Sequence, residues 1–295
     1  KHEVSEAKFV SDWGIESDAH AGHWHRQVSL LSLQKIEEFR ARGVAVEFGA
    51  FGENLIVDGY DFRNLPVGTK FRCNDVLLEM TQIGKECHSH CEIYKRVGDC
   101  IMPREGVFTR VLKGGEIKAG DEITMLPLEK DRPFTAAVIT LSDKGAAGER
   151  EDKSGPLIQE MLMKEGYDVI ETLLLPDGEQ PLKHQLMRLA DQRQVNVIFT
   201  TGGTGFAERD VTPEATQAVC DRMAMGIADA IRQYSLSITG RAMLSRAVSG
   251  IRKKTLIVNL PGSPKAVKES LEYVLPHLGH GLGILRGTDG ECGNS

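Results

Sequence analysis

The second half of the chain alternates short apolar runs with stretches that have the length and periodicity of helices. The apolar runs lie at 135–141, 167–174, 195–200 and 255–260. Helices are predicted at 154–166, at about 180–193, after Pro213 and after Pro264. Strands separated by helices at this spacing run parallel, because each helix carries the chain back to the same edge of the sheet. The pattern predicts an α/β fold, with a parallel sheet covered by helices on both faces.

The first half of the chain has a different sequence pattern, which predicts short strands and frequent turns. Residues 71–83 predict one strand, and residues 106–126 predict a hairpin around Gly114 and Gly115. One helix is predicted from about Leu33 to Arg42, just before Gly43. This half is therefore predicted to be mainly β, and a β-barrel is one fold that would fit the pattern.

A short polar stretch separates the β-rich first half from the α/β second half. Residues 125–134 read MLPLEKDRPF and carry two prolines and a charge cluster between strand-like runs. Such a composition is typical of a linker between two domains. We expect a first domain at 1–127, a linker at 128–133, a second domain at 134–287 and a tail at 288–295.

Composition narrows the class of protein. The chain has 36 Lys and Arg against 42 Asp and Glu, which gives a formal net charge of −6. A net negative charge argues against a general nucleic-acid-binding surface. No apolar run approaches the ~18 residues of a membrane span, and no signal peptide is visible. Three of the six cysteines cluster between Cys87 and Cys100. We expect a reduced, cytoplasmic protein without disulfides, and further residues before Lys1.

Three unusual turns follow strands of the predicted parallel sheet. They are LSDKG at 141–145, TTGGTG at 200–205 and NLPGSP at 259–264. In an open parallel sheet, ligands sit beyond the carboxyl ends of the strands. Glycines let backbone N–H groups approach an anion, and Ser and Thr hydroxyls add donors. The three turns predict an anion site, although one such turn alone is equally compatible with a tight connection. The spacing is neither a Walker A loop nor a GxGxxG motif.

Two acidic residues lie at the same predicted edge. Asp177 follows the second strand, and Asp210 follows the glycine turn. Either residue could cap the next helix, as Ser154 is predicted to do for its own helix. The alternative is a Mg²⁺ site, since this cation prefers carboxylate and phosphate oxygens and needs few protein ligands. Phosphate-binding turns beside two carboxylates predict nucleotidyl transfer.

Four separated motifs in the second half resemble one family. TTGGTGFAERDVTPEAT, LSDKG followed by EDKSGPLI, LLPDGEQ, and LSRAVSGIRKKTLIVNLPGSPKAVKE are similar to the molybdopterin adenylyltransferase family, which includes the gephyrin G domain. The resemblance runs from about 134 to 287. It implies an enzyme that joins molybdopterin to AMP from ATP and releases pyrophosphate.

The resemblance also implies site residues. Asp177 and Asp210 match the acids implicated in catalysis and Mg²⁺ handling. The residues expected to bind the pterin and its phosphate are Ser142, Asp143, Ser154, Thr201, Gly202, Gly203, Thr204, Gly205, Pro261, Gly262 and Ser263. Two positions depart from the family pattern, because Glu208 precedes Arg209 where Pro is frequent and Gly178 separates Asp177 from Glu179.

The first half contains two segments rich in histidine and cysteine, at 18–32 and 84–108. They allow a zinc site, although the spacing matches no standard zinc motif. They also allow buried, inert cysteines, or a reactive thiol at Cys87 activated by Lys85 and His88. The histidines near Trp24 are equally compatible with polar groups that line a turn.

DAHAGHWHRQVSLL together with TRVLKGGEIKAGDEI resembles the molybdenum cofactor sulfurase C-terminal (MOSC) domain, over about residues 1–127. The resemblance implies a β-barrel-like fold and a cysteine that carries sulfur or contacts the cofactor. Cys87 is the favoured cysteine and Cys100 is its rival. Arg26 and Arg110 are expected to face the pocket, where arginine suits phosphate, and surface ion pairs are the alternative.

The composition predicts a cytoplasmic protein of two domains, and the two resemblances imply an enzyme of molybdenum cofactor assembly. The second domain is predicted to be Mg-dependent and to use ATP and molybdopterin as substrates. The first is predicted to bind the finished cofactor or to alter its sulfur ligand. The resemblance implies a homo-oligomer, a trimer, and a molybdenum-insertion enzyme as partner. A carrier that binds the molybdenum or tungsten cofactor without turnover is the alternative from another functional class.

Overall fold

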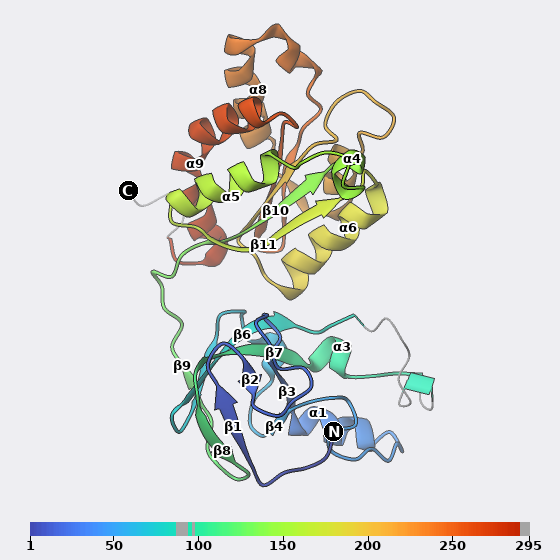
Figure 1. Ribbon diagram of the computed structural model, residues 1–295, viewed down its shortest axis with the longest axis vertical. Coiled ribbons are helices and arrows are strands. Elements are labelled where there is room, and N and C mark those ends of the chain that lie inside the picture. Colours follow the sequence, from blue (N-terminus) through green and yellow to red (C-terminus); the bar gives the residue numbers. More distant parts are fainter. Residues whose placement is uncertain (87–93, 96–97, 290–295) are drawn as a thin grey trace. The chain divides into compact units, whose positions relative to one another are not determined.

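The computed structural model describes residues 1–86, 94–95 and 98–289 (Figure 1). The chain divides into two compact units, Lys1–Glu129 and Lys130–Ser295. The division falls within residues 128–133, the stretch for which the sequence predicts a linker. Each unit has hydrophobic clusters of its own, so each is described by itself.

The first unit is mainly β, as its sequence predicts. One sheet has the strand order β4-β3-β7-β6-β5-β9 and another has the order β2-β1-β8. The strands are β1 Glu6–Val10, β2 Gly14–Ile15, β3 Val28–Ser32, β4 Leu55–Val57, β5 Lys70–Cys73, β6 Val76–Ile83, β7 Val107–Lys113, β8 Gly115–Lys118 and β9 Thr124–Leu126. The helical segments are α1 Leu33–Arg40, the 3-10 turn η1 Phe62–Asn64 and α3 Met102–Glu105. The predicted helix at 33–42 is confirmed as α1, which buries Ile36 and Phe39.

Two local predictions for this unit are wrong. Residues 71–83 form an antiparallel hairpin of β5 and β6 with Cys73 opposite Val76, because Asn74 turns the chain at a φ of 52°. The expected hairpin around Gly114 and Gly115 does not form. Strand β7 pairs with β3 and β6, whereas β8 pairs with β1. At Gly114 a Cβ would lie 2.6 Å from the carbonyl oxygen of Phe9, so glycine allows the chain to cross between sheets there.

The second unit is built on one mixed sheet of order β11-β10-β12-β15-β14-β13. Its strands are β10 Thr135–Leu141, β11 Asp168–Leu175, β12 Val197–Thr201, β13 Arg222–Met223, β14 Ser249–Arg252 and β15 Thr255–Leu260. The first four strands in the sheet order are parallel, and β14 and β13 add an antiparallel edge. Strands β12 and β15 are buried along their whole length, which explains their continuous apolar sequences.

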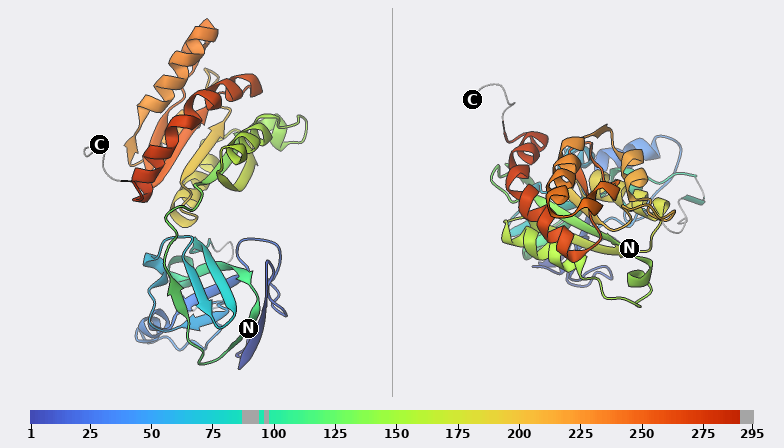
Figure 2. Two further views of the ribbon diagram at one scale, coloured as in Figure 1. Left: turned by 90° about the vertical axis from the view of Figure 1, so that its left-hand side faces the viewer. Right: turned by 90° about the horizontal axis from the view of Figure 1, so that it is seen from above.

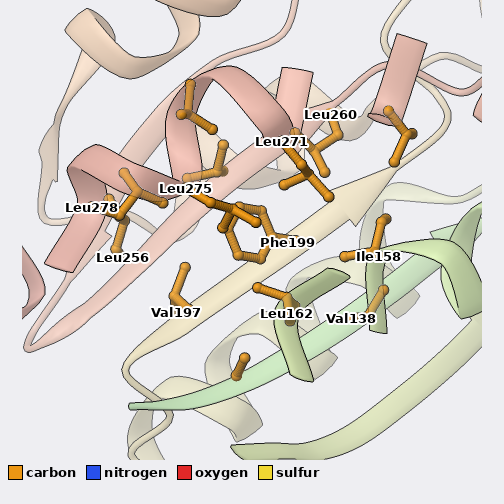
Figure 3. Close-up of a cluster of buried hydrophobic side chains, with 14 of the residues drawn as sticks. Val138, Ile158, Leu162, Val197, Phe199, Leu256, Leu260, Leu271, Leu275 and Leu278 are labelled. Atoms are coloured by element: carbon orange, nitrogen blue, oxygen red, sulfur yellow. The ribbon is translucent and has the colours of Figure 1, made fainter. Parts of the chain in front are cut away.

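Helices cover both faces of this sheet, which confirms the predicted α/β fold (Figures 1 and 2). They are α4 Asp143–Ala146, α5 Ser154–Lys164, α6 Glu179–Met187 with its π-helical extension Arg188–Gln192, α7 Thr212–Val219, α8 Met225–Ile238, the 3-10 segment η3 Gly240–Leu244 and α9 Pro264–Arg286. One core lies under α5, α8 and α9, where Phe199 of β12 packs among Ile158, Leu162 and Leu271 (Figure 3). The other lies under α6 and α7, where Leu182 and Ala215 share a cluster with Ile139.

Within the described part of the chain, no helix has both the length and the apolar character that a bilayer crossing requires.

Candidate functional site

The parallel register brings the three predicted turns to one edge of the second unit's sheet. Thr140 of β10 pairs with Thr201 of β12, and Thr201 pairs with Leu260 of β15. Leu141 pairs with Leu175 of β11, two residues before Asp177. The four strands therefore end together, and the turns and acids that follow them lie at the same edge.

The glycines of the 202–205 turn are required by its backbone. Gly202 has a φ of +95° and Gly203 a φ of +64°, a region that favours glycine. A Cβ on Gly202 would lie 2.3 Å from the carbonyl oxygen of Leu141, and one on Gly203 would lie 2.5 Å from the hydroxyl oxygen of Thr212. The turn is therefore packed directly against the end of β10.

The carbonyl oxygens of this turn are all engaged by donors of the protein. The oxygen of Gly202 accepts from the Thr212 hydroxyl at 2.9 Å, and the oxygen of Gly203 accepts from the Thr212 N–H at 3.1 Å. The oxygens of Thr204 and Gly205 accept from the N–H and Nε of Arg246, at 3.0 and 2.7 Å.

The N–H groups of the same turn behave differently. Within residues 1–86, 94–95 and 98–289, no hydrogen bond has the N–H of Gly203, Thr204 or Gly205 as its donor. Three successive N–H groups are thus left to a ligand or to water. Such a run of backbone donors, held by fixed carbonyls, has the chemistry of an anion site.

The turn at 259–264 is bonded to the end of β12 and to the start of α5, and it lies against the glycine turn. The Thr201 hydroxyl donates to the oxygen of Pro261 at 2.6 Å, and the Ser154 hydroxyl donates to the oxygen of Gly262 at 3.0 Å. Gly262 approaches the glycine turn closely, since a Cβ there would lie 3.5 Å from the Cα of Gly202. Ser263 instead caps α9, where its Oγ accepts from the N–H of Ala266 at 3.3 Å.

The predicted capping role of Ser154 is wrong. The Oδ1 of Asp152 accepts the N–H groups of both Ser154 and Gly155, each at 3.0 Å, so Asp152 satisfies the start of α5. Ser154 lies inside the first turn of the helix. This position frees its hydroxyl to hold the Gly262 turn.

Asp143 and Asp177 hold each other in place. The N–H of Asp143 donates to Oδ2 of Asp177 at 3.1 Å, and the N–H of Asp177 donates to Oδ1 of Asp143 at 2.9 Å. Ser142 caps the short helix α4, where its Oγ accepts from the N–H of Gly145 at 3.1 Å. The loops after β10 and β11 are therefore fixed to one another by their acidic residues.

Asp210 fixes the loop that follows the glycine turn. Its Oδ2 accepts from the N–H of Ala207 at 3.0 Å, and its carbonyl oxygen accepts from Arg246. The helix-capping alternative fails for both acids, because α6 and α7 begin after Gly178 and Val211 without a side-chain cap. The carboxylates of Asp177 and Asp210 therefore serve loops at the edge of the sheet.

These acids fit a metal ion only in part. No three His, Cys, Asp or Glu side chains among the described residues are grouped to hold a metal ion. Mg²⁺ commonly uses one or two carboxylates and takes its other ligands from phosphate and water. A magnesium ion at these carboxylates would therefore need its remaining ligands from phosphate and water.

In the first unit, Arg26 lies over two aromatic rings. Its Cζ lies 4.7 Å from the centroid of the Trp24 ring and 5.7 Å from that of Phe108. Arg110 shares a face of β7 with Phe108, two residues away, and is half exposed. Its Nε pairs with Oε2 of Glu79 at 2.5 Å, as in the surface ion pair that the sequence allowed.

The cysteines of the first unit are only partly described. Cys87, the favoured thiol, lies outside the described residues, together with Cys91 and His88. Cys100 is buried in the cluster around α1. The zinc alternative gains no support from the described residues, which contain no metal-binding group of three side chains.

Two family models match the chain. The probable molybdopterin binding domain matches residues 137–280, and the MOSC domain matches residues 17–124. A molybdopterin adenylyltransferase of Helicobacter pylori is 40% identical over 153 residues, which are 51% of this chain and 87% of that protein. The chain belongs to the molybdopterin adenylyltransferase family.

Other relatives of the molybdopterin adenylyltransferase family agree. The molybdopterin adenylyltransferase of Haemophilus influenzae is 45% identical over 139 residues, covering 46% of this chain and 71% of that protein. The solved structure of the molybdopterin biosynthesis enzyme MoaB from Thermus thermophilus is 45% identical, with a TM-score of 0.50, and covers 52% of this chain and 97% of that one. The family models and these relatives confirm the molybdopterin adenylyltransferase resemblance, and the MOSC family model confirms the resemblance of the first half.

Three residues that hold the loops of this site are not predicted from the sequence. Asp152 satisfies the start of α5, Arg246 holds the glycine turn and the Asp210 carbonyl, and Arg209 pairs with Asp143. All three lie inside the motifs that carry the resemblance. Their partners are distant in sequence or depend on local geometry, so spacing alone does not reveal their roles.

Proposed function

We propose that the second unit transfers AMP from ATP to molybdopterin in a Mg-dependent reaction that releases pyrophosphate. The observation that carries this proposal is the arrangement of the glycine turn, in which every carbonyl is engaged and three successive N–H groups have no acceptor in the described chain. Relatives named molybdopterin adenylyltransferase support the choice of substrates.

In this reaction the terminal phosphate of molybdopterin attacks the α-phosphorus of ATP, a new P–O bond forms, and pyrophosphate leaves. The N–H groups of Gly203, Thr204 and Gly205 hold phosphate oxygens in place, so positioning and electrostatics supply most of the catalysis. Asp177 and Asp210 would hold Mg²⁺, which neutralises developing charge on the phosphates when bound.

Other predicted residues support this site through the backbone. Thr201 and Ser154 hold the Pro261 and Gly262 carbonyls, and Asp143 positions the Asp177 loop. Ser142 and Ser263 cap the helices that follow two of the turns. We assign them to shaping the pocket for the pterin and its phosphate.

The decisive experiment mixes the purified full chain with ATP, Mg²⁺ and molybdopterin and measures pyrophosphate. We expect release that requires all three components, together with an adenylylated pterin. Molybdopterin binding without pyrophosphate release would contradict adenylyl transfer and favour the carrier alternative.

For the first unit, we propose that it binds the molybdenum cofactor or alters its sulfur ligand. Arg26 is the preferred phosphate-binding residue, because it lies beside the aromatic rings of Trp24 and Phe108 and a guanidinium recognises phosphate in bidentate fashion. Arg110 is the second candidate, and it forms an ion pair with Glu79. Cys87 remains the proposed functional thiol and Cys100 its rival.

A thiol-labelling experiment tests this assignment. Burial raises the pKa of the Cys220 thiol to about 11 and also raises the pKa of Cys73 above its usual value. Thiolates are the reacting species, so both cysteines should react slowly with limiting iodoacetamide at about pH 7.5. Cys87 should be labelled first and should be protected by the cofactor. First labelling at Cys100 would transfer the role to that residue.

We further propose a cytoplasmic location, a homotrimeric assembly and a molybdenum-insertion enzyme as the recipient of the adenylylated product. These proposals follow from the family resemblance and from the chemistry of the product, an activated pterin that must be passed to an enzyme that adds metal.

A further inference from the structure

Arg209 joins two loops at the rim of the candidate site. Its Nη2 forms an ion pair with Oδ2 of Asp143, across a sequence separation that contains α5, β11, α6 with its π-helical extension, and β12. The Arg209 side chain is 65% exposed and that of Asp143 is 32% exposed. The guanidinium is therefore accessible to a ligand from solvent.

The loop that carries Arg209 is held by other contacts. Arg246 binds the carbonyl oxygens of Gly205 and Asp210, one on each side of Arg209, and the Asp210 carboxylate accepts the N–H of Ala207. These bonds fix the backbone around Arg209. The loop thus has a frame that does not depend on the Arg209–Asp143 ion pair.

Asp143 can also keep its place without Arg209. Its Oδ1 accepts the N–H of Asp177, and its own N–H donates to the Asp177 carboxylate. Only Oδ2 is used by Arg209. The ion pair is therefore an additional contact between two loops that are each fixed already.

We propose that Arg209 is a phosphate-binding residue for the nucleotide, and that it exchanges its ion pair with Asp143 for the nucleotide's phosphate chain. The inference rests on the proposed function and names the side chain that would receive the polyphosphate of ATP. Asp143 competes with the ligand for the same guanidinium and thereby sets its affinity.

Physical chemistry favours the exchange. An exposed ion pair is weak because water and salt screen it, whereas a phosphate group offers arginine a doubly charged, bidentate partner. The free N–H groups of Gly203 to Gly205 precede Arg209 by four to six residues on the same loop. Gly202 lies against Leu141, two residues before Asp143. One polyphosphate could thus meet both the backbone donors and the guanidinium.

Calorimetric binding of ATP and of inorganic pyrophosphate to the full chain, without molybdopterin, tests the exchange. Arg209→Ala should weaken both ligands by about tenfold or more, and Arg209→Lys should recover part of the loss. Asp143→Asn should tighten both ligands by about threefold or more, because asparagine can still accept the Asp177 N–H but no longer competes as an anion. The exposed Arg222→Ala on β13 removes the same charge elsewhere and should change neither Kd.

A double-variant cycle separates exchange from general electrostatics. In the Arg209→Ala background, Asp143→Asn should lose most of its tightening effect. A purely structural ion pair would make both single variants weaken binding, and that result would overturn the inference. Equal tightening by Asp143→Asn in both backgrounds, or no binding of either probe to the parent chain, would also overturn it. Adenylyl transfer is judged separately by pyrophosphate release, so the two proposals can fail independently.

Discussion

Asp177→Asn should lower the turnover number for pyrophosphate release by about 100- to 1,000-fold. A carboxylate that serves a cation matters most while charge moves on the phosphates, so the loss should fall on the chemical step. Asparagine retains an oxygen that can accept the N–H of Asp143, which is bonded to Asp177 at 3.1 Å in the native chain. The loop should keep its position, and the Kd of molybdopterin should change by less than about threefold.

The matched control is Asp168→Asn. Asp168 begins β11, the strand that Asp177 follows, and its side chain is exposed at the opposite end of that strand. This variant removes the same charge without touching the turns and should keep normal turnover. If Asp177→Asn also turns over normally, Asp177 only holds the Asp143 loop and its catalytic assignment is wrong.

The arrangement of the second unit could be predicted because its signals are local and repeated. Buried parallel strands such as β12 and β15 read as continuous apolar runs, and parallel order places their following turns at one edge. The shared edge, the turns and both acids were therefore accessible from sequence.

The errors arose where a contact depends on distant residues or on exact geometry. The Gly114–Gly115 pair resembled a hairpin turn, but Phe9, about a hundred residues earlier, approaches Gly114 and β8 pairs with β1. Ser154 had the composition of a cap, yet Asp152, two residues earlier, takes that role. Periodicity carries no information about either contact.

The same limit explains why Arg246 was missed. Its side chain binds loop carbonyls that lie 36 and 41 residues earlier in the chain, and no periodic pattern links those positions. The glycines of the 202–205 turn predict a close approach of the backbone, because they lack a Cβ. The sequence does not predict the neighbour, which for Gly202 is the carbonyl oxygen of Leu141.

Gly202→Ala should lower the free energy of unfolding of the second unit by about 3 kcal/mol or more. The residue has a φ of +95°, and the new Cβ would lie 2.3 Å from the backbone oxygen of Leu141, which cannot move without shifting β10. For a unit of this size, such a loss corresponds to a decrease in Tm of about 10 °C, measurable by scanning calorimetry of the full chain. The folded fraction should also bind molybdopterin more weakly, because relief of the clash displaces the N–H groups that follow Gly202.

Gly226→Ala is the matched control, since Gly226 lies in the first turn of α8 and a Cβ there meets nothing within 4 Å. Alanine is the better helix former, so this variant should be as stable as the parent or more stable by up to about 1 kcal/mol. The contrast isolates the close approach at Gly202 from the general effect of replacing glycine. A Gly202→Ala variant that melts within about 1 °C of the parent and binds molybdopterin equally well would show that the turn can adjust. In that case the fixed carbonyls would not be what presents the three N–H groups to the ligand.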